Sequence, residues 1–299
     1  MATKQKSRNR RPSTRDRGPR YVEPVLDPNW QSPYVPSAEE RESNSAAVRR
    51  YGWRRRIPAT IAVAVLVVAL VVGVVVSIWL AVLGVVIGAL YGWDLYRSFD
   101  RLERLGTGAG ENVAQLITEG GSAHDRQRLA IVVDRLCATF GVDGLTALII
   151  EDGGYNATLM RRDGGLVLYV TSALLRDFEL IELEGVVAHC LARQRLGLLE
   201  RQCIAASVSL EEAARRSLAG VGQCYRADEV AAAAIRYPLG LASALRRCAD
   251  QGVLEGSYFA SPAFSLTRWS WFNPFADRAE TDLGDLDDPR LRSLALEEW

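Results

Sequence analysis

The uncharged segment of residues 57–93 constrains this chain more than any other feature. It reads IPATIAVAVLVVALVVGVVVSIWLAVLGVVIGALYGW and contains no Asp, Glu, Lys or Arg. A segment that is apolar around every face of a helix is typical of a membrane span rather than of a surface helix. It also lies too far along the chain, and is too long, to be a signal peptide.

The length of this segment favours two membrane crossings. One helix of 37 residues would extend roughly 55 Å, whereas the hydrocarbon layer of a bilayer is about 30 Å thick. We therefore expect a transmembrane hairpin with short helices at residues 58–74 and 76–93, turning near residues 73–77. Trp79, Tyr91 and Trp93 are candidates for the membrane interfaces. A single tilted span is the alternative.

Charge and cysteine usage predict the side of the membrane. Residues 1–56 carry a net charge of +8 and the rest of the chain carries −8, from 14 Lys and Arg against 6 Asp and Glu in the first part. The arginines immediately before the apolar segment (Arg49, Arg50, Arg54, Arg55 and Arg56) predict a cytoplasmic N-terminus. A hairpin returns the following domain to the cytoplasm, which fits five scattered cysteines without a C-x-x-C pair. We expect a multi-pass protein of the plasma membrane.

The remaining chain divides into three parts. Residues 1–48 are polar, rich in Arg and interrupted by Pro, so we expect a disordered basic tail. Its charge fits the positive-inside rule, and we expect no nucleic-acid partner. Residues 94–124 form a charged helix followed by a flexible break at the GTGAG run of residues 106–110. Residues 125–299 are expected to form the main domain.

Hydrophobic periodicity predicts an α+β domain that is mainly helical. Residues 125–140 and 181–197 have helical spacing, and further helical stretches follow up to residue 250. Residues 145–151, 155–162 and 166–171 have the character of strands, with hairpin-turn signals at Gly153-Gly154 and at residues 163–165. The sequence therefore predicts a small β-sheet among helices.

The helix at residues 181–197 carries an altered zinc-peptidase motif. In H-E-x-x-H, the two His lie at i and i+4 on one helix face, and the Glu activates the zinc-bound water. Here His189 takes the first position, Cys190 replaces the Glu and Arg193 replaces the second His. The other His in the chain, His124, lies in a polar stretch far upstream.

Four local patterns, in order, accompany this helix. They are Asn156-Ala157 on a strand, Tyr169–Leu175 leading to the helix, Ala227-Asp228 before an Ala-rich stretch, and LASAL at residues 241–245. The chain from residue 57 onward thereby resembles the HtpX-type membrane zinc peptidases, the family that includes the CAAX prenyl endopeptidases. The resemblance implies a zincin-like peptidase domain after a transmembrane hairpin, and it implies zinc proteolysis. It also places the third zinc ligand, normally Glu, at Cys224.

The residues at these positions argue against catalysis. Arg193 keeps its proton and has no lone pair, so it cannot bind a cation, and we expect it to pair with Asp228. Cys190 is a poor replacement for a carboxylate base. We therefore assign no catalytic residue and regard His189, Cys190, Arg193, Cys224 and Asp228 as vestigial. We expect no cofactor, although zinc on His189 and Cys224, or a Cys224–His189 hydrolase, stays open.

The strand before the motif keeps one function available. In the family that this chain resembles, an extended substrate lies along this strand, so Tyr155, Asn156 and Ala157 are predicted to bind a peptide by main-chain pairing. Our leading hypothesis is a membrane-anchored, inactive peptidase homologue that binds a peptide or a membrane-protein partner and regulates it. The alternatives are a divergent active zinc endopeptidase and a structural membrane anchor.

Overall fold

The computed structural model describes residues 32–76, 78–208, 210–278 and 285–299, with side chains described throughout except at residues 55–56, 58–59, 75–76, 80 and 94–103. Most of the predicted basic tail, residues 1–31, lies outside the described residues. Tyr34–Trp299 form one compact unit.

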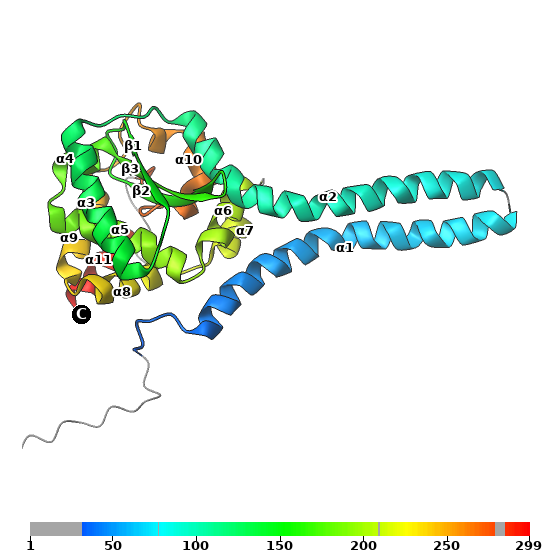
Figure 1. The fold of residues 1–299 in the computed structure, drawn as a ribbon, viewed down its shortest axis with the longest axis horizontal. Helices are drawn as coiled ribbons and strands as arrows, with labels where there is room; N and C mark the ends of the chain where they lie inside the picture. The colour runs from blue at the N-terminus through cyan, green and yellow to red at the C-terminus, as the bar shows by residue number, and fades with distance from the viewer. Residues whose placement is uncertain (1–31, 77, 209, 279–284) are drawn as a thin grey trace, which may run out of the picture. The chain divides into compact units, whose positions relative to one another are not determined.

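Two long helices contain the uncharged segment. Helix α1 (Ala38–Val76) and helix α2 (Ile78–Leu116) each have 39 residues and pack along each other (Figure 1). Both are much longer than the short helices predicted, because each continues in polar sequence beyond the apolar segment. The predicted turning region, near residues 73–77, includes the observed break between them.

Two of the predicted segment boundaries were wrong. Residues 38–48, predicted to be disordered, belong to α1, where Val48 is buried and the Asn44 side-chain amide donates to the carbonyl of Leu196 at 2.8 Å. The GTGAG run, predicted to be a flexible break, lies inside α2. There Gly110 is buried against the backbone of Arg161, so tertiary packing overrides the weak helix propensity of glycine.

Within the residues that the structure describes, no helix has an apolar stretch long enough to cross a membrane.

The described strands form one three-stranded sheet. They are β1 (Leu145–Ile150), β2 (Ala157–Arg162) and β3 (Gly165–Thr171), in the spatial order β1-β3-β2. Strands β2 and β3 form the predicted hairpin around residues 163–164, in antiparallel register. The Gly153-Gly154 turn does not make a second hairpin, because β3 pairs in parallel with β1 and separates it from β2.

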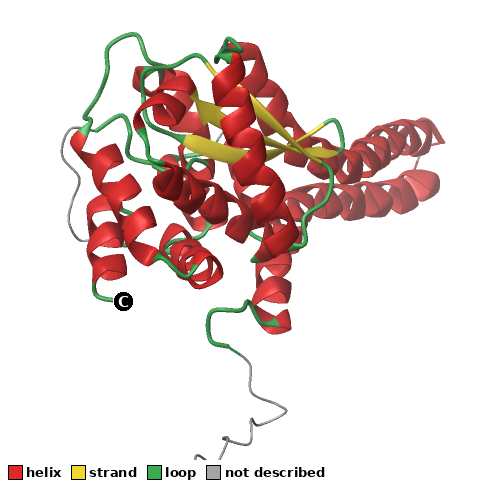
Figure 2. Cartoon of the chain, turned by 60° about the vertical axis from the view of Figure 1, so that its left-hand side comes forward, coloured by secondary structure: helices red, strands yellow, loops and turns green. Residues whose placement is uncertain are grey.

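Helices surround this sheet and make up most of the chain, which confirms a mainly helical α+β fold (Figure 2). The α-helices that follow α2 are α3 (Ala123–Phe140), α4 (Ser172–Asp177), α5 (Leu180–Arg195), α6 (Leu199–Ser207), α7 (Glu212–Ala219), α8 (Gln223–Ile235), α9 (Pro238–Asp250), α10 (Pro262–Thr267) and α11 (Pro289–Glu297), with short 3₁₀ helices at Tyr258–Ala260 and Arg268–Ser270.

Helix α5 is the centre of the core. It packs against α3, α8, α9 and β2, and its residues are buried on all faces through most of its length. Glycines allow α9 to approach closely: a Cβ on Gly185 would meet the backbone of Leu241 at 2.8 Å, and one on Gly240 would meet the carbonyl oxygen of Ile181 at 2.9 Å. The helix that carries His189 is therefore fixed in place by its neighbours.

Candidate functional site

Helix α5 holds the altered motif inside the domain. Glu179 and Glu182 form a capping box that fixes the start of the helix. His189 and Cys190 have no exposed surface, and Arg193 is 1% exposed. A helix that is apolar around most of its circumference is buried on all sides, so the motif residues meet protein groups rather than bulk water.

His189 belongs to a buried network of three charged or polar side chains. Its Nδ1 lies 2.7 Å from Oδ1 of Asp228 on α8. The same carboxylate accepts hydrogen bonds from Arg292 on α11, at 2.5 Å from Nε to Oδ2 and 2.9 Å from Nη2 to Oδ1. Arg292 is fully buried and also donates from Nη1 to the carbonyl of Phe272 at 2.7 Å. The pair is therefore bidentate, which is the strongest arrangement of these two groups.

The prediction that Arg193 pairs with Asp228 was wrong. Arg193 instead donates from Nε to Oε1 of Gln202 at 2.6 Å, and from Nη1 to the carbonyl of Ser270. Its guanidinium is thus held by α6 and by the 3₁₀ helix Arg268–Ser270. Arg292, about a hundred residues later, supplies the cation that Asp228 binds.

The protonation of His189 follows from this environment. Burial, together with the cations of Arg292 and Arg193, lowers the pKa of His189 to about 4 against the opposing attraction of Asp228. The ring is therefore neutral, and the short contact to a carboxylate places its proton on Nδ1. Nη2 of Arg292 lies 3.4 Å from this same nitrogen, but two donors cannot bond each other. Nε2 then carries a lone pair and has no hydrogen-bond partner among the described residues.

The ion pair beside His189 remains charged. Burial raises the pKa of Asp228, but Arg292 and His189 outweigh that effect and leave the pKa below its ordinary value. Burial lowers the pKa of Arg292, and Asp228 reverses this, so the pKa lies above its ordinary value. A permanent positive charge therefore lies next to the imidazole at every pH at which the chain folds.

Cys190 and Cys224 are buried thiols. Burial raises the pKa of Cys190 to about 11, and burial together with Asp287 raises that of Cys224 to about 12. Both remain protonated near neutral pH, and a protonated thiol is neither a nucleophile nor a good ligand. Within the described residues, no group of three His, Cys, Asp or Glu side chains is placed to hold a metal ion.

The predicted peptide-binding edge is covered by the chain itself. β2 lies at the edge of the sheet, but residues 270–273 run antiparallel along it, with a bridge from Thr158 to Trp271. The Phe272 amide donates to the carbonyl of Ala157 at 2.8 Å. Asn156 donates from Nδ2 to the Asn273 carbonyl at 2.8 Å and accepts from its amide at 2.9 Å.

Burial shows that this covering segment is part of the core. Asn156, Ala157, Trp271 and Phe272 have no exposed surface, and the Phe272 ring lies edge-on to His189 at 5.0 Å between centroids. Asn156 and Ala157 are therefore wrong as sites for an external peptide. Tyr155 is half-buried, and its hydroxyl donates to Asp177 at 2.9 Å.

Sequence reasoning missed the roles of Arg292 and of residues 270–273. Both lie in segments that follow the motif by 80 residues or more, and the signal in them was weak: an FNPF run at residues 272–275, and the apolar spacing of the last helix. Neither pattern indicates which side chain reaches His189.

Comparison of the chain with protein-family models, with curated proteins and with solved structures found no match.

Proposed function

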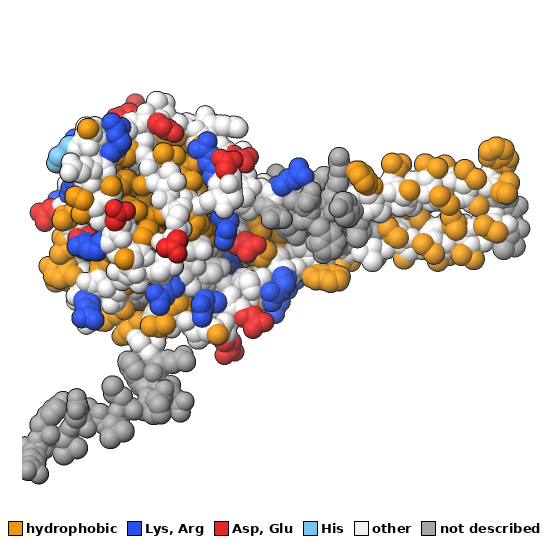
Figure 3. Space-filling view, viewed as in Figure 1, with side chains coloured by type: hydrophobic (Ala, Val, Ile, Leu, Met, Phe, Trp, Pro, Cys, Tyr) orange, Lys and Arg blue, Asp and Glu red, His pale blue; other side chains and the backbone are white. Residues whose placement is uncertain are grey.

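We propose that this chain is a membrane-anchored, non-catalytic relative of the HtpX-type zinc peptidases that acts by binding and regulating a protein partner. The observation that carries the proposal is the exposed apolar surface of α1 and α2. Their side chains between residues 57 and 93 lie outside the core that the domain buries (Figure 3).

The exposure is high and extends over both helices. Val68 is 62% exposed, Val74 is 65% and Ile78 is 75%. Other exposed apolar residues are Ile57, Ile61, Val65, Val67, Val71, Val72, Val82, Leu83, Val85, Val86 and Leu90. Soluble proteins rarely expose continuous apolar patches larger than a few hundred Å², and a bilayer removes such a surface from water.

The ends of the apolar region have the residues of a membrane interface. Trp53 and Trp93 are exposed at the base of the two helices, where aromatic rings favour the headgroup region. Arg49, Arg50 and Arg54 are exposed just before the apolar region of α1. The proposed orientation has both the N-terminus and the domain in the cytoplasm.

The groups that surround the motif support a non-catalytic role. A guanidinium lies beside His189, the position of the catalytic carboxylate holds a protonated thiol, and β2 is paired with residues 270–273. Water activation requires a base, and substrate alignment requires a free edge. The partner is accordingly proposed to bind elsewhere on the molecule than at the motif and the edge of β2.

One observation favours the second candidate, a divergent zinc endopeptidase. The Nε2 atom of His189 is buried with its lone pair unpartnered among the described residues, and such an atom is a potential metal ligand. Cys224 is the proposed second ligand. This candidate requires deprotonation of a thiol whose pKa burial has raised to about 12.

The membrane anchor is tested by fractionation. Full-length protein is expected to stay in the membrane pellet after carbonate extraction. The triple variant Val65→Lys, Val68→Lys, Val72→Lys is expected to move to the supernatant, because a charge at the bilayer centre costs several kcal/mol. The matched variant with Leu at these positions should stay in the pellet. Release of the wild-type protein by carbonate would refute the anchor.

A further inference from the structure

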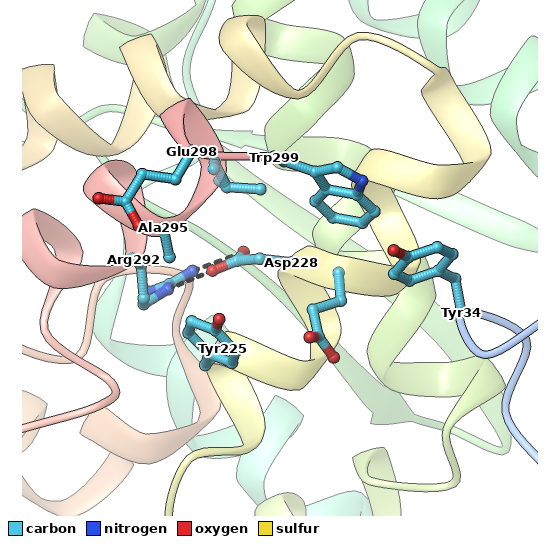
Figure 4. Close-up of a pocket in the computed structure, with 9 residues that line it drawn as sticks. Tyr34, Tyr225, Asp228, Arg292, Ala295, Glu298 and Trp299 are labelled. Carbon is cyan, nitrogen blue, oxygen red and sulfur yellow. Dashed lines mark hydrogen bonds and ion pairs between the residues drawn. The ribbon is translucent and has the colours of Figure 1, made fainter.

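A cavity of about 220 Å³ lies beside the buried network and has no role in the proposed function (Figure 4). It is formed by α8, α11, the residues that follow α11 and the residues that precede α1. The side chains that matter are Tyr34, Tyr225, Glu229, Glu298 and Trp299, with the Asp228–Arg292 pair at its base. These groups come from three segments far apart in sequence, because the residues after α11 continue directly from that helix.

The two charged side chains at the base of the cavity, Asp228 and Arg292, are paired with each other. Asp228 accepts hydrogen bonds from His189 and Arg292, and Arg292 donates to Asp228 and to the Phe272 carbonyl. The side chains of the walls and the rim therefore determine which ligands the cavity can bind.

The walls are aromatic. The rings of Tyr34 and Trp299 lie 4.6 Å apart at 35°, and Figure 4 shows Tyr225 on the opposite side of the cavity. Aromatic faces carry negative electrostatic potential and attract organic cations. Trp299 is 45% exposed, so a solute can reach this wall directly.

The rim is acidic. Glu298 is exposed, and Glu229 also lines the cavity, with Arg226 bonded to its outer side at 2.9 Å. Asp228, Glu229 and Glu298 against Arg292 give the lining a net charge of −2, and Arg226 reduces it to about −1. A negative rim around aromatic faces attracts cations and repels anions.

From this arrangement we propose that the cavity binds a small organic cation, either an alkylammonium or a guanidinium group. The Trp299, Tyr34 and Tyr225 rings contact the cation, and Glu298 and Glu229 supply the opposite charge. The cation belongs either to a free solute or to a basic side chain of a peptide, since both present the same group to the rings.

Ligand-observed NMR on full-length protein in an uncharged maltoside detergent tests the proposal. Three probes are used: choline, its neutral isostere 3,3-dimethylbutanol, and acetyl-arginine amide. Choline binding alone identifies a free alkylammonium solute, and acetyl-arginine amide binding identifies a basic side chain. Equal binding of choline and the neutral alcohol would overturn the proposal. So would the absence of binding of both cations at about 10 mM, a concentration above the dissociation constants of most specific complexes.

Four variants test whether the cation binds in this cavity. Trp299→Ala and Tyr225→Ala should each weaken binding about tenfold, and Glu298→Gln should weaken it less because that carboxylate is exposed. Trp53→Ala removes an exposed tryptophan that does not line the cavity and should leave binding unchanged. An unchanged affinity in Trp299→Ala, in protein with wild-type thermal unfolding, would also overturn the proposal.

Discussion

At the scale of single residues, Arg292 determines the chemistry around His189. The motif alone showed that Cys190 and Arg193 could not serve as base and ligand, because those properties belong to the side chains themselves. The source of the buried cation could not be predicted, because α8 and α11 meet only in the folded chain. We expected Asp228 to pair with Arg193, whereas its partner in the structure is Arg292.

Loss of one partner of the Asp228–Arg292 pair should destabilise the fold much more than replacement of both partners by uncharged residues. Asp228→Asn or Arg292→Met alone leaves one buried charge without its partner, which should lower the free energy of unfolding by about 3–5 kcal/mol. The double variant Asp228→Asn with Arg292→Met should lose much less stability than the sum of the losses in the two single variants. Denaturant unfolding of the detergent-solubilised protein measures this, and additive losses would contradict the pair.

His189 should make the protein less stable in acid. Its pKa is about 4 in the folded chain and about 6.5 in the unfolded chain, so the unfolded state binds more protons between these values. Stability should therefore fall as the pH drops from 6.5 to 4, by at most about 3 kcal/mol. His189→Gln should remove this component of the pH profile.

Exposed His124 supplies the control for that profile. Its side chain is 84% exposed, so His124→Gln should keep the wild-type dependence. The buried carboxyl Asp287 has a raised pKa, which acts in the opposite direction, and comparison of the variants cancels it. Identical pH profiles for wild type and His189→Gln would contradict the assignment.

At the scale of elements, the sequence showed where strands and helices occur better than it showed their limits and pairing. Apolar alternation and a D-G-G turn identified the β2–β3 hairpin. The parallel β1–β3 pair and the covering of β2 by residues 270–273 depend on contacts between distant segments, so local patterns do not reveal them. Helix α2 passes through the GTGAG run because its position against the sheet outweighs local flexibility.

The glycines of that run should therefore differ in their response to alanine. A Cβ on Gly110 would collide with the carbonyl of Arg161, so Gly110→Ala should lower the free energy of unfolding by about 1–3 kcal/mol. Nothing lies within 4 Å of a Cβ on Gly108, so Gly108→Ala should be neutral or stabilise by up to about 1 kcal/mol. Thermal unfolding compares the two, and equal effects would show that α2 does not pack there as described.

At the scale of the whole molecule, the uncharged segment and the domain that carries the altered motif belong to one compact unit. The proposed membrane anchor would bury the exposed apolar surface of α1 and α2, while both helices pack onto α6 and α2 also packs onto β2 of the domain. The domain keeps the arrangement of a helix beside a sheet edge, but its own residues 270–273 lie along that edge. Composition and periodicity led us to expect a membrane anchor, which stays a prediction, whereas the covering of the sheet edge could be seen only in the folded chain.

The central claim is that the domain is non-catalytic, and zinc content tests it most directly. The full-length protein would be purified without a metal-affinity tag, beside His189→Ala and Cys224→Ala, and analysed for elemental zinc. We predict far less than one zinc per chain in all three, because cations and protonated thiols surround His189. About one zinc per chain in the wild type, lost in both variants, would contradict the account and identify a divergent zinc peptidase.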